Sequence, residues 1–224
     1  MKKPILMPKN IPLFEGIAEN ELQALLTCLS ATERIYEKDQ FIFSVGEPAS
    51  LVGIIRSGDV HIVKEDFLGN RTIIAALSAG DVFGEAFACA RAKNLPVSVV
   101  ATTECEIILI DFQKIISTCS SSCGFHSRMI ENMLGIVASK NVALNQKVEI
   151  ISKRSTREKL IAFLSMYAQR TGRRQFEIPF NRQELADYIC VERSAMSAEL
   201  SKMQRDGLIR TTKHQFELLY TPEE

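Results

Sequence analysis

The chain has 224 residues, of which 46% are hydrophobic, and its 27 basic and 27 acidic side chains give a formal net charge of zero at pH 7. This length allows two domains with one connecting element, and the ordinary globular composition gives each part enough apolar residues for a packed core. No segment approaches the about 20 apolar residues of a membrane-spanning helix, so the composition and hydropathy exclude a membrane-embedded chain.

The charge is unevenly distributed along the chain. Residues 1–151 contain 14 basic and 17 acidic side chains, whereas residues 152–224 contain 13 basic and 10 acidic side chains. The basic excess therefore lies in the C-terminal third, where it favours binding to a phosphate backbone.

The N-terminal stretch MKKPILMPKNIPLF has no apolar run long enough for an export signal, and prolines interrupt it. We therefore expect a cytoplasmic protein with no membrane partner. In that compartment its six cysteines are expected to be thiols rather than a disulfide framework.

A helix is expected from residue 19 to residue 29, and residues 33–110 then change to short β-branched and apolar runs. The runs are 40–43, 52–55, 60–63, 72–75, 97–100 and 106–110. Glycines punctuate them at turn positions, and regularly spaced short strands of this kind indicate an antiparallel sandwich or barrel. A jelly roll of about eight strands has a suitable size.

The segment CSSSCGFH contains the tightest cluster of metal-binding residue types, Cys119, Cys123 and His126. These three are one ligand short of a closed site, so they are weak metal candidates that Cys28 or a partner subunit would have to complete. The alternative is a pair of free thiols whose pKa the positive end of a following helix lowers. We expect Cys89, Cys105 and Cys190 to be small core residues, and we assign no cofactor.

Residues 125–151 have a helical period with a heptad seam. The seam residues are Ile130, Leu134, Val137, Asn141, Leu144 and Val148. An asparagine at an a position of such a seam fixes the register of a parallel pair of helices, so we predict a homodimer. A second stripe, Met129, Met133 and Ile136, is expected to pack on the chain's own β domain. The alternative is a single core helix with a wide apolar face.

Residues 181–204 are typical of a helix-turn-helix. Asn181 and Glu184 form a capping-box pair for the first helix, and Cys190 and Val191 leave a connection of only a few residues. The second helix has an apolar face of Val191, Met196, Leu200 and Met203. Its open face carries Arg193 and short hydroxyl side chains, and an arginine in the first turn of a recognition helix can pair with guanine O6 and N7.

Three strand-like runs flank these helices: 176–178 before them, and 208–212 and 215–219 after them, the last two joined by Lys213 and His214. The alternative is a helical hairpin that binds no nucleic acid. A helix-turn-helix with such a wing is a more specific pattern than two helices alone, so we predict that this region binds double-stranded DNA.

Together, GIIRSGDVHIV (53–63), LSAGDVFGEA (77–86) and the helix-turn-helix resemble the Crp/Fnr family of bacterial transcription regulators. The resemblance implies an α+β fold with an effector-sensing β-roll domain of the double-stranded β-helix type (1–124), a dimerisation helix (125–152) and a winged helix-turn-helix (153–224). It also implies a homodimer on a pseudo-palindromic operator, with RNA polymerase as a further partner.

The resemblance assigns DNA-binding roles by motif position. Arg193 matches the family's principal base-reading arginine, Ser194 and Ser197 match other reading positions, and Arg182 matches a phosphate-contacting arginine. We add Lys202 and, as a wing contact, His214. Ala198 stands where a second arginine is common, so the operator is expected to differ from those of the best-known members.

The effector side of the resemblance is incomplete. The family's FGE segment, which holds the ribose and phosphate of a cyclic nucleotide, is retained as Phe83, Gly84 and Glu85, but Leu95-Pro96 replaces the Arg-Ser pair that neutralises the cyclic phosphate. The adenine-contacting pair on the long helix matches Leu144-Asn145. We therefore expect a small effector other than cyclic AMP. The expected site comprises Phe83, Gly84, Glu85, Ala86, Arg91, Leu144 and Asn145.

No enzyme is expected, because the sequence has no nucleophile elbow, Walker loop, HExxH motif or dinucleotide-binding fingerprint. A cupin-type enzyme would need a cluster of His and Glu ligands inside the roll, and His61 is the only histidine there. The sequence thus predicts a DNA-binding regulator controlled by a small effector or a redox signal. The alternative is a ligand-independent dimeric DNA-binding protein whose β domain is only a scaffold.

Overall fold

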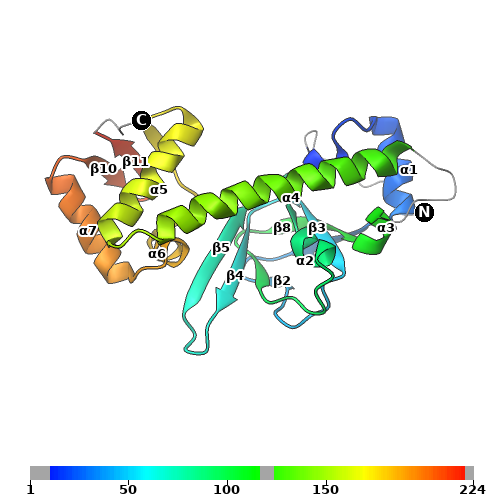
Figure 1. The fold of residues 1–224 in the computed structure, drawn as a ribbon, viewed down its shortest axis with the longest axis horizontal. Coiled ribbons are helices and arrows are strands. Elements are labelled where there is room, and N and C mark those ends of the chain that lie inside the picture. The colour runs from blue at the N-terminus through cyan, green and yellow to red at the C-terminus, as the bar shows by residue number, and fades with distance from the viewer. Residues whose placement is uncertain (1–10, 117–123, 220–224) are drawn as a thin grey trace. The chain divides into compact units, whose positions relative to one another are not determined.

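The computed structural model describes residues 11–116 and 124–219 (Figure 1). It divides into two compact units, the first formed by residues 1–69 and 74–141 and the second by residues 70–73 and 142–224. Helix α4 (Gly124–Ile151) contributes to both units and corresponds to the predicted helical segment 125–152. The predicted domain boundaries stay a prediction.

The β-roll has eight strands within the described residues. Its helices are η1 (Pro12–Phe14), α1 (Glu19–Cys28), α2 (Glu85–Cys89) and α3 (Phe112–Ile116). Its strands are β1 (Thr32–Tyr36), β2 (Phe41–Phe43), β3 (Leu51–Ser57), β4 (Val60–Glu65), β5 (Arg71–Leu77), β6 (Val82–Phe83), β7 (Ser98–Ala101) and β8 (Cys105–Asp111). They form two four-stranded sheets, ordered β1-β8-β3-β6 and β2-β7-β4-β5. This architecture confirms the predicted jelly roll.

All six predicted runs are strands, and the sequence missed β1 and β6. Most of β1 is exposed, and Glu33 and Arg34 give it no apolar run, although Thr32 to Tyr36 pair with Leu109 to Cys105 of β8. Strand β6 has only two residues, too few for a period to be read. Both strands are therefore defined by their partners rather than by their own composition.

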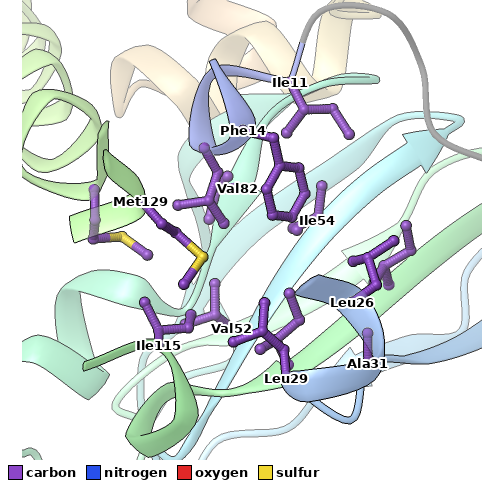
Figure 2. Packing of buried hydrophobic residues seen from close by; sticks show 14 of the residues in the cluster. Ile11, Phe14, Leu26, Leu29, Ala31, Val52, Ile54, Val82, Ile115 and Met129 are labelled. Carbon is purple, nitrogen blue, oxygen red and sulfur yellow. The ribbon is translucent and has the colours of Figure 1, made fainter. Parts of the chain in front are cut away.

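One core cluster lies between α1, β3, α3 and the start of α4 (Figure 2). Leu26 and Leu29 from the α1 region pack with Val52 and Ile54 of β3, and Met129 of α4 joins them. Met133 is also buried in this cluster and Ile136 packs against it, which confirms that the second stripe of α4 binds its own β domain.

The other core cluster fills the inside of the roll, and the Phe83 ring is at its centre. The side chain is fully buried and makes an edge-to-face contact with Phe43, with ring centroids 5.2 Å apart. A Cβ atom at Gly53 of β3 would lie 2.1 Å from Cζ of Phe83, much closer than van der Waals contact allows. The ring can occupy this space only because residue 53 has no side chain.

The second unit is a winged helix-turn-helix, as predicted. It contains α5 (Thr156–Thr171), β9 (Gln175–Glu177), α6 (Arg182–Ile189), α7 (Arg193–Arg205), β10 (Ile209–Thr212) and β11 (Gln215–Leu218). The strands form an antiparallel sheet in the order β10-β11-β9. Aromatic rings of α5, α6 and the wing pack together, with Phe163 of α5 within 6.2 Å of Phe180 and 5.6 Å of Tyr188 between ring centroids.

Within residues 11–116 and 124–219, no helix combines the length and the apolar character needed to cross a membrane.

The close approach of Phe83 to Gly53 gives a stability prediction. Gly53→Ala introduces a methyl group into an occupied space, and overpacking of a core typically costs about 1–3 kcal/mol, so the free energy of unfolding measured in urea should fall by that amount. The same change in a Phe83→Leu background should cost much less, because the smaller side chain vacates the space. An equal cost in both backgrounds would contradict this account of the packing.

Candidate nucleic-acid interface and effector site

The start of α6 has the predicted capping box. Asn181 Oδ1 accepts hydrogen bonds from the backbone N–H groups of Gln183 and Glu184 at 2.9 and 3.0 Å, and Glu184 Oε2 accepts one from the Asn181 N–H at 2.7 Å. The helix ends at Cys190, which has a left-handed φ of 55°. Val191 lies in the turn, where its N–H donates to Ala186 O, so its predicted place on the second helix is wrong.

Helix α7 has one buried and one open face. Met196, Leu200 and Met203 are buried against the rest of the unit, as predicted. Arg193 and Ser194 are exposed in the first turn, Ser197 is half-buried and Lys202 is exposed in the last turn. Four of the predicted DNA-binding residues therefore lie on the same helix, with Arg193 at its positive N-terminal end.

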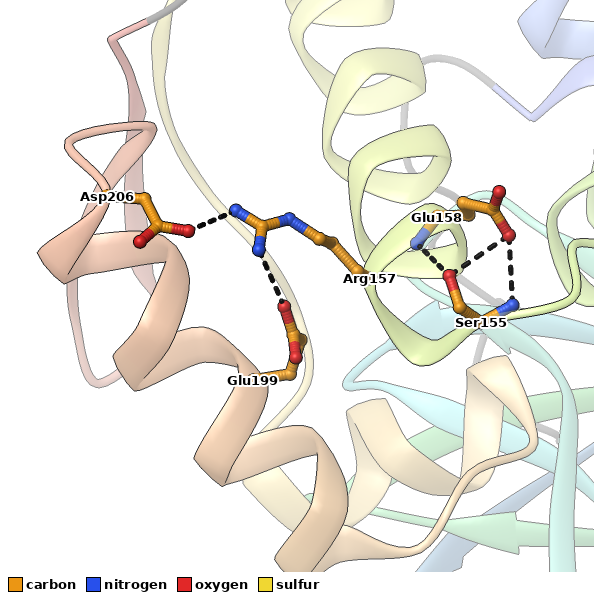
Figure 3. Close-up of polar contacts among 5 residues, drawn as sticks. All are labelled: Ser155, Arg157, Glu158, Glu199 and Asp206. Atoms are coloured by element: carbon orange, nitrogen blue, oxygen red, sulfur yellow. Dashed lines mark hydrogen bonds and ion pairs between the residues drawn. The ribbon is translucent and has the colours of Figure 1, made fainter.

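Arg157 of α5 fixes the orientation of α7 (Figure 3). Its guanidinium lies 3.3 Å from Glu199 Oε1 and donates a hydrogen bond to Asp206 Oδ2, so it contacts both the middle and the end of α7. The hydrogen bond from Arg157 lowers the pKa of Asp206 below its usual value. Ser155 caps α5 itself, accepting from the Glu158 N–H at 3.2 Å. Neither α5 nor this contact was predicted from the sequence, since Arg157 lies far from α7 along the chain.

Arg182, the predicted phosphate contact, is turned toward the wing. Its side chain donates to Thr211 Oγ1 at 3.0 Å, and its guanidinium carbon lies 5.2 Å from the centre of the Phe216 ring. One terminal nitrogen is buried with no hydrogen-bond partner among the described residues, and burial lowers the pKa of the side chain. In this arrangement Arg182 joins α6 to the wing.

His214 lies at the wing turn that follows Lys213. The residue is half-buried, and its Nδ1 is 2.9 Å from Phe180 O, which ties the turn to the segment before α6. Lys213 has a left-handed φ of 52° and is exposed. The wing hairpin therefore presents Lys213 to solvent, a residue that the sequence analysis left out of the interface.

In the β-roll, the segment from Phe83 to Ala86 forms a tight turn that leads into α2. Gly84 has φ 83°, and a Cβ there would approach Leu51 O to 2.6 Å, so only glycine suits this position. The Glu85 side chain that follows is 2% exposed, and its Oε1 lies 2.7 Å from Nζ of Lys140 on α4. Lys140 also donates to Val82 O. The FGE segment is thus paired with a residue of the chain itself, which the sequence analysis did not identify.

Leu95, which replaces the phosphate-binding arginine of the resemblance, is a core residue. It is 4% exposed and belongs to the same core cluster as Phe83 and Phe43. Its backbone is also held, because its N–H donates to Glu47 O and its carbonyl accepts from the Gly46 N–H, both at 2.8 Å. An apolar side chain therefore occupies the inside of the roll at this position.

Three further residues of the predicted effector site are exposed: Arg91, Leu144 and Asn145. Arg91 is exposed and lines a hollow of about 430 Å³ whose described lining does not include Phe83, Gly84 or Glu85. The lining residues are Ala49, Ser50, Ala88, Arg91, Ala92, Phe112 and Gln113. Leu144 and Asn145 are exposed on α4 in the second unit.

The cysteines do not form a recognised site in the described part of the chain. Cys119 and Cys123 lie outside the described residues, and His126 is buried in α4. No group of metal-binding side chains is found within residues 11–116 and 124–219. Cys105 is a core residue as predicted, whereas Cys89 and Cys190 are exposed, so that prediction was wrong for both. Each lies at or near a helix end, where its backbone places it at the surface.

Two family models match the chain: the cyclic nucleotide-binding domain over residues 33–122 and the Crp-like helix-turn-helix domain over residues 158–222. The "Cyclic AMP receptor protein" of Thermus thermophilus is 23% identical over 206 residues, which are 90% of this chain and 89% of that protein. "Glutaminase 1" of Bradyrhizobium diazoefficiens is 30% identical over 142 residues, 63% of this chain, but the chain covers only 22% of that protein.

The fold also matches solved structures. The c-di-GMP responsive global regulator CLP of Xanthomonas campestris superposes with a TM-score of 0.71, at 20% sequence identity, over 88% of this chain and 99% of that structure. At this identity the match establishes a shared fold, and the order of β-roll, long helix and helix-turn-helix agrees with both family models.

Proposed function

Because the chain belongs to the Crp/Fnr family of DNA-binding transcription regulators, we propose that it binds a pseudo-palindromic operator as a homodimer, reading bases with Arg193, Ser194 and Ser197. The observation that carries this proposal is the open face of α7, since Arg193 and Ser194 are exposed while the opposite face is buried. Cytoplasmic location and RNA polymerase as a partner follow from the same proposal.

The contacts around α7 support separate roles for the other basic residues. Lys202 and Lys213 are exposed and suit phosphate contacts, which add affinity without reading sequence. Arg182 has its guanidinium against Phe216 and Thr211, so the geometry favours a role in positioning the wing over a phosphate contact. His214 has a similar role, since it holds the wing turn to Phe180 O.

The exposed apolar residues of α4 support the homodimer. In the single chain, Leu134 is 67% exposed, and Leu144 and Val148 are both 51% exposed, although all three lie on the predicted seam. Exposed apolar side chains at heptad spacing are expected to be buried against a second helix. Asn141 is also exposed on this seam, where two copies of its side chain would meet across the dimer axis.

The packing inside the roll favours DNA binding that needs no ligand over DNA binding that is controlled by cyclic AMP. Phe83 and Leu95 fill the interior, and Leu95 offers no charge for a cyclic phosphate. Losing a charge-assisted contact to phosphate typically forfeits about 1.5–3 kcal/mol. The second candidate is control by another small effector, which the hollow beside Arg91, Ser50 and Gln113 favours as a site for a small anion.

Replacing Arg193 tests the DNA-reading assignment. Arg193→Ala should weaken binding to an operator selected from random DNA by about 1–3 kcal/mol and relax specificity at one base pair of each half-site. Arg170→Ala is the control, because Arg170 is an exposed arginine on the last turn of α5 and not part of the recognition helix. A selected-sequence profile that is unchanged in Arg193→Ala would disprove this assignment of the recognition helix.

Two valines of α4 with similar exposure test the dimer. Val148→Glu puts a charge in the seam and should shift the protein to a monomer in analytical ultracentrifugation at micromolar concentration. Val142 is 58% exposed but lies off the seam, so Val142→Glu should leave the dimer intact. A wild-type chain that sediments as a monomer while binding its operator would refute the homodimer.

Calorimetry tests the effector side. Cyclic AMP titrated into the protein should give no micromolar binding, because the leucine at position 95 supplies neither charge nor hydrogen bond. A thermal-shift screen of small anions separates the two forms of regulation, since an effector at about 100 times its dissociation constant adds about 2.7 kcal/mol of stability. A micromolar cyclic AMP site that Glu85→Ala abolishes would overturn the proposal.

A further inference from the structure

The two partners of the ion pair between Glu85 and Lys140 differ in how deeply they are buried. The Glu85 side chain is 2% exposed, whereas that of Lys140 is 32% exposed, and Glu85 Oε1 and Lys140 Nζ are 2.7 Å apart. The second oxygen of Glu85 is buried with no hydrogen-bond partner among the described residues. A carboxylate removed from water in this way is stabilised by a nearby cation. In the described part of the chain, Lys140 is the cation that forms a salt bridge with Glu85.

The β-roll fixes the position of the Glu85 end of this pair. Gly84 holds the turn in a left-handed conformation against Leu51 O, and Phe83 anchors it in the interior beside Gly53. Lys140 makes a second contact at the same place, donating to Val82 O of β6. The ammonium group is therefore held at one point of the roll by a charge and by a backbone carbonyl.

The Lys140 end of the pair lies on α4 beside the seam. Asn141 follows it directly and Val137 lies three residues before it, and both belong to the predicted dimer seam. Successive residues of a helix are separated by about 100° around its axis, so a contact at Lys140 determines which direction its neighbours face. The apolar contacts of Met129 and Met133 occur nearer the start of α4 and leave the Lys140 turn without a buried apolar residue of its own.

We propose that Lys140 is a positioning residue for DNA binding: its ion pair with Glu85 sets the rotation of α4 on the β-roll and presents the seam to a second subunit. The inference rests on the proposed function of a homodimer on an operator. The chain itself supplies this contact, so the dimer helix is held to the FGE turn without a bound effector. Loss of the pair is expected to weaken dimerisation and two-half-site binding while leaving the helix-turn-helix itself intact.

The test compares variants of both partners by fluorescence anisotropy, on an operator selected by the wild-type protein and on a single half-site. Lys140→Met keeps the apolar stem and removes the charge. It should reduce affinity for the full operator by about tenfold or more, leave half-site affinity unchanged, and raise the dimer dissociation constant in sedimentation. Lys140→Arg should restore all three quantities toward wild type.

The double variant Glu85→Gln/Lys140→Met keeps the proposal testable if Lys140→Met fails to fold, because it leaves no buried charge unpaired. It should show the same loss of full-operator affinity and an altered preference among operators whose half-site spacing varies by single base pairs around one helical turn. Arg128→Met is the matched control: Arg128 is an exposed cation on α4 that pairs with the exposed Glu131 at 3.2 Å.

A full-to-half-site affinity ratio, spacing preference and dimer constant that remain at wild-type values in the double variant would overturn the inference. A wild-type protein that binds neither a full operator nor a half-site would instead refute the proposed function. The two failures are therefore distinguished by the wild-type measurement alone.

Discussion

The space shared by Phe83 and Gly53 is the constraint on which the first unit depends. Because residue 53 has no Cβ, the Phe83 ring fills the centre of the roll, and this fixes the turn that begins at Gly84. This turn places Glu85 in a buried position, where its carboxylate is paired with Lys140. Packing in the interior therefore determines where the Glu85 carboxylate lies, and so where α4 forms its ion pair with the roll.

The two units differ in how many of the family's motif residues they contain. The second unit has a capped first helix, an open recognition helix and a wing. Asn181 caps the first helix, and Arg157 pairs with Glu199 and Asp206 at the recognition helix. The first unit keeps the FGE turn but has apolar side chains inside the roll, with Leu95 among them. The second unit therefore has the elements of a DNA-binding domain, and the first unit has the β-roll of a cyclic nucleotide-binding domain with an apolar side chain at position 95.

The charged contacts differ in what they can contribute. Arg157 with Glu199 and Asp206 lies partly in solvent, where ion pairs add little to stability, so its main effect is to define the orientation of α7. The pair of Glu85 and Lys140 is different, because removing Lys140 leaves the buried Glu85 carboxylate without its cation. On α7, these exposed ion pairs act beside a buried apolar face. On α4, the Glu85–Lys140 pair adds a buried charge contact to the apolar contacts of Met129 and Met133.

The sequence by itself determined the features that have a local period or a local motif. The six strand runs, the helical period of α4 and the capping box at Asn181 were all readable, because a regular spacing of side chains or a short motif defines them. The heptad seam of α4 stays a prediction. The polar strand β1 and the two-residue β6 were not, since pairing with other strands defines them. Val191 was misplaced because helix boundaries depend on the exact turn geometry.

Only the tertiary structure decided which residues of the candidate site meet. It paired Glu85 with Lys140, placed Leu95 in the core and turned Arg182 toward Phe216. These relations join residues far apart in the chain, and no period or spacing in the sequence encodes them. They arise because close packing and the pairing of buried polar groups determine which side chains are neighbours. These neighbours meet only once the strands and helices have packed.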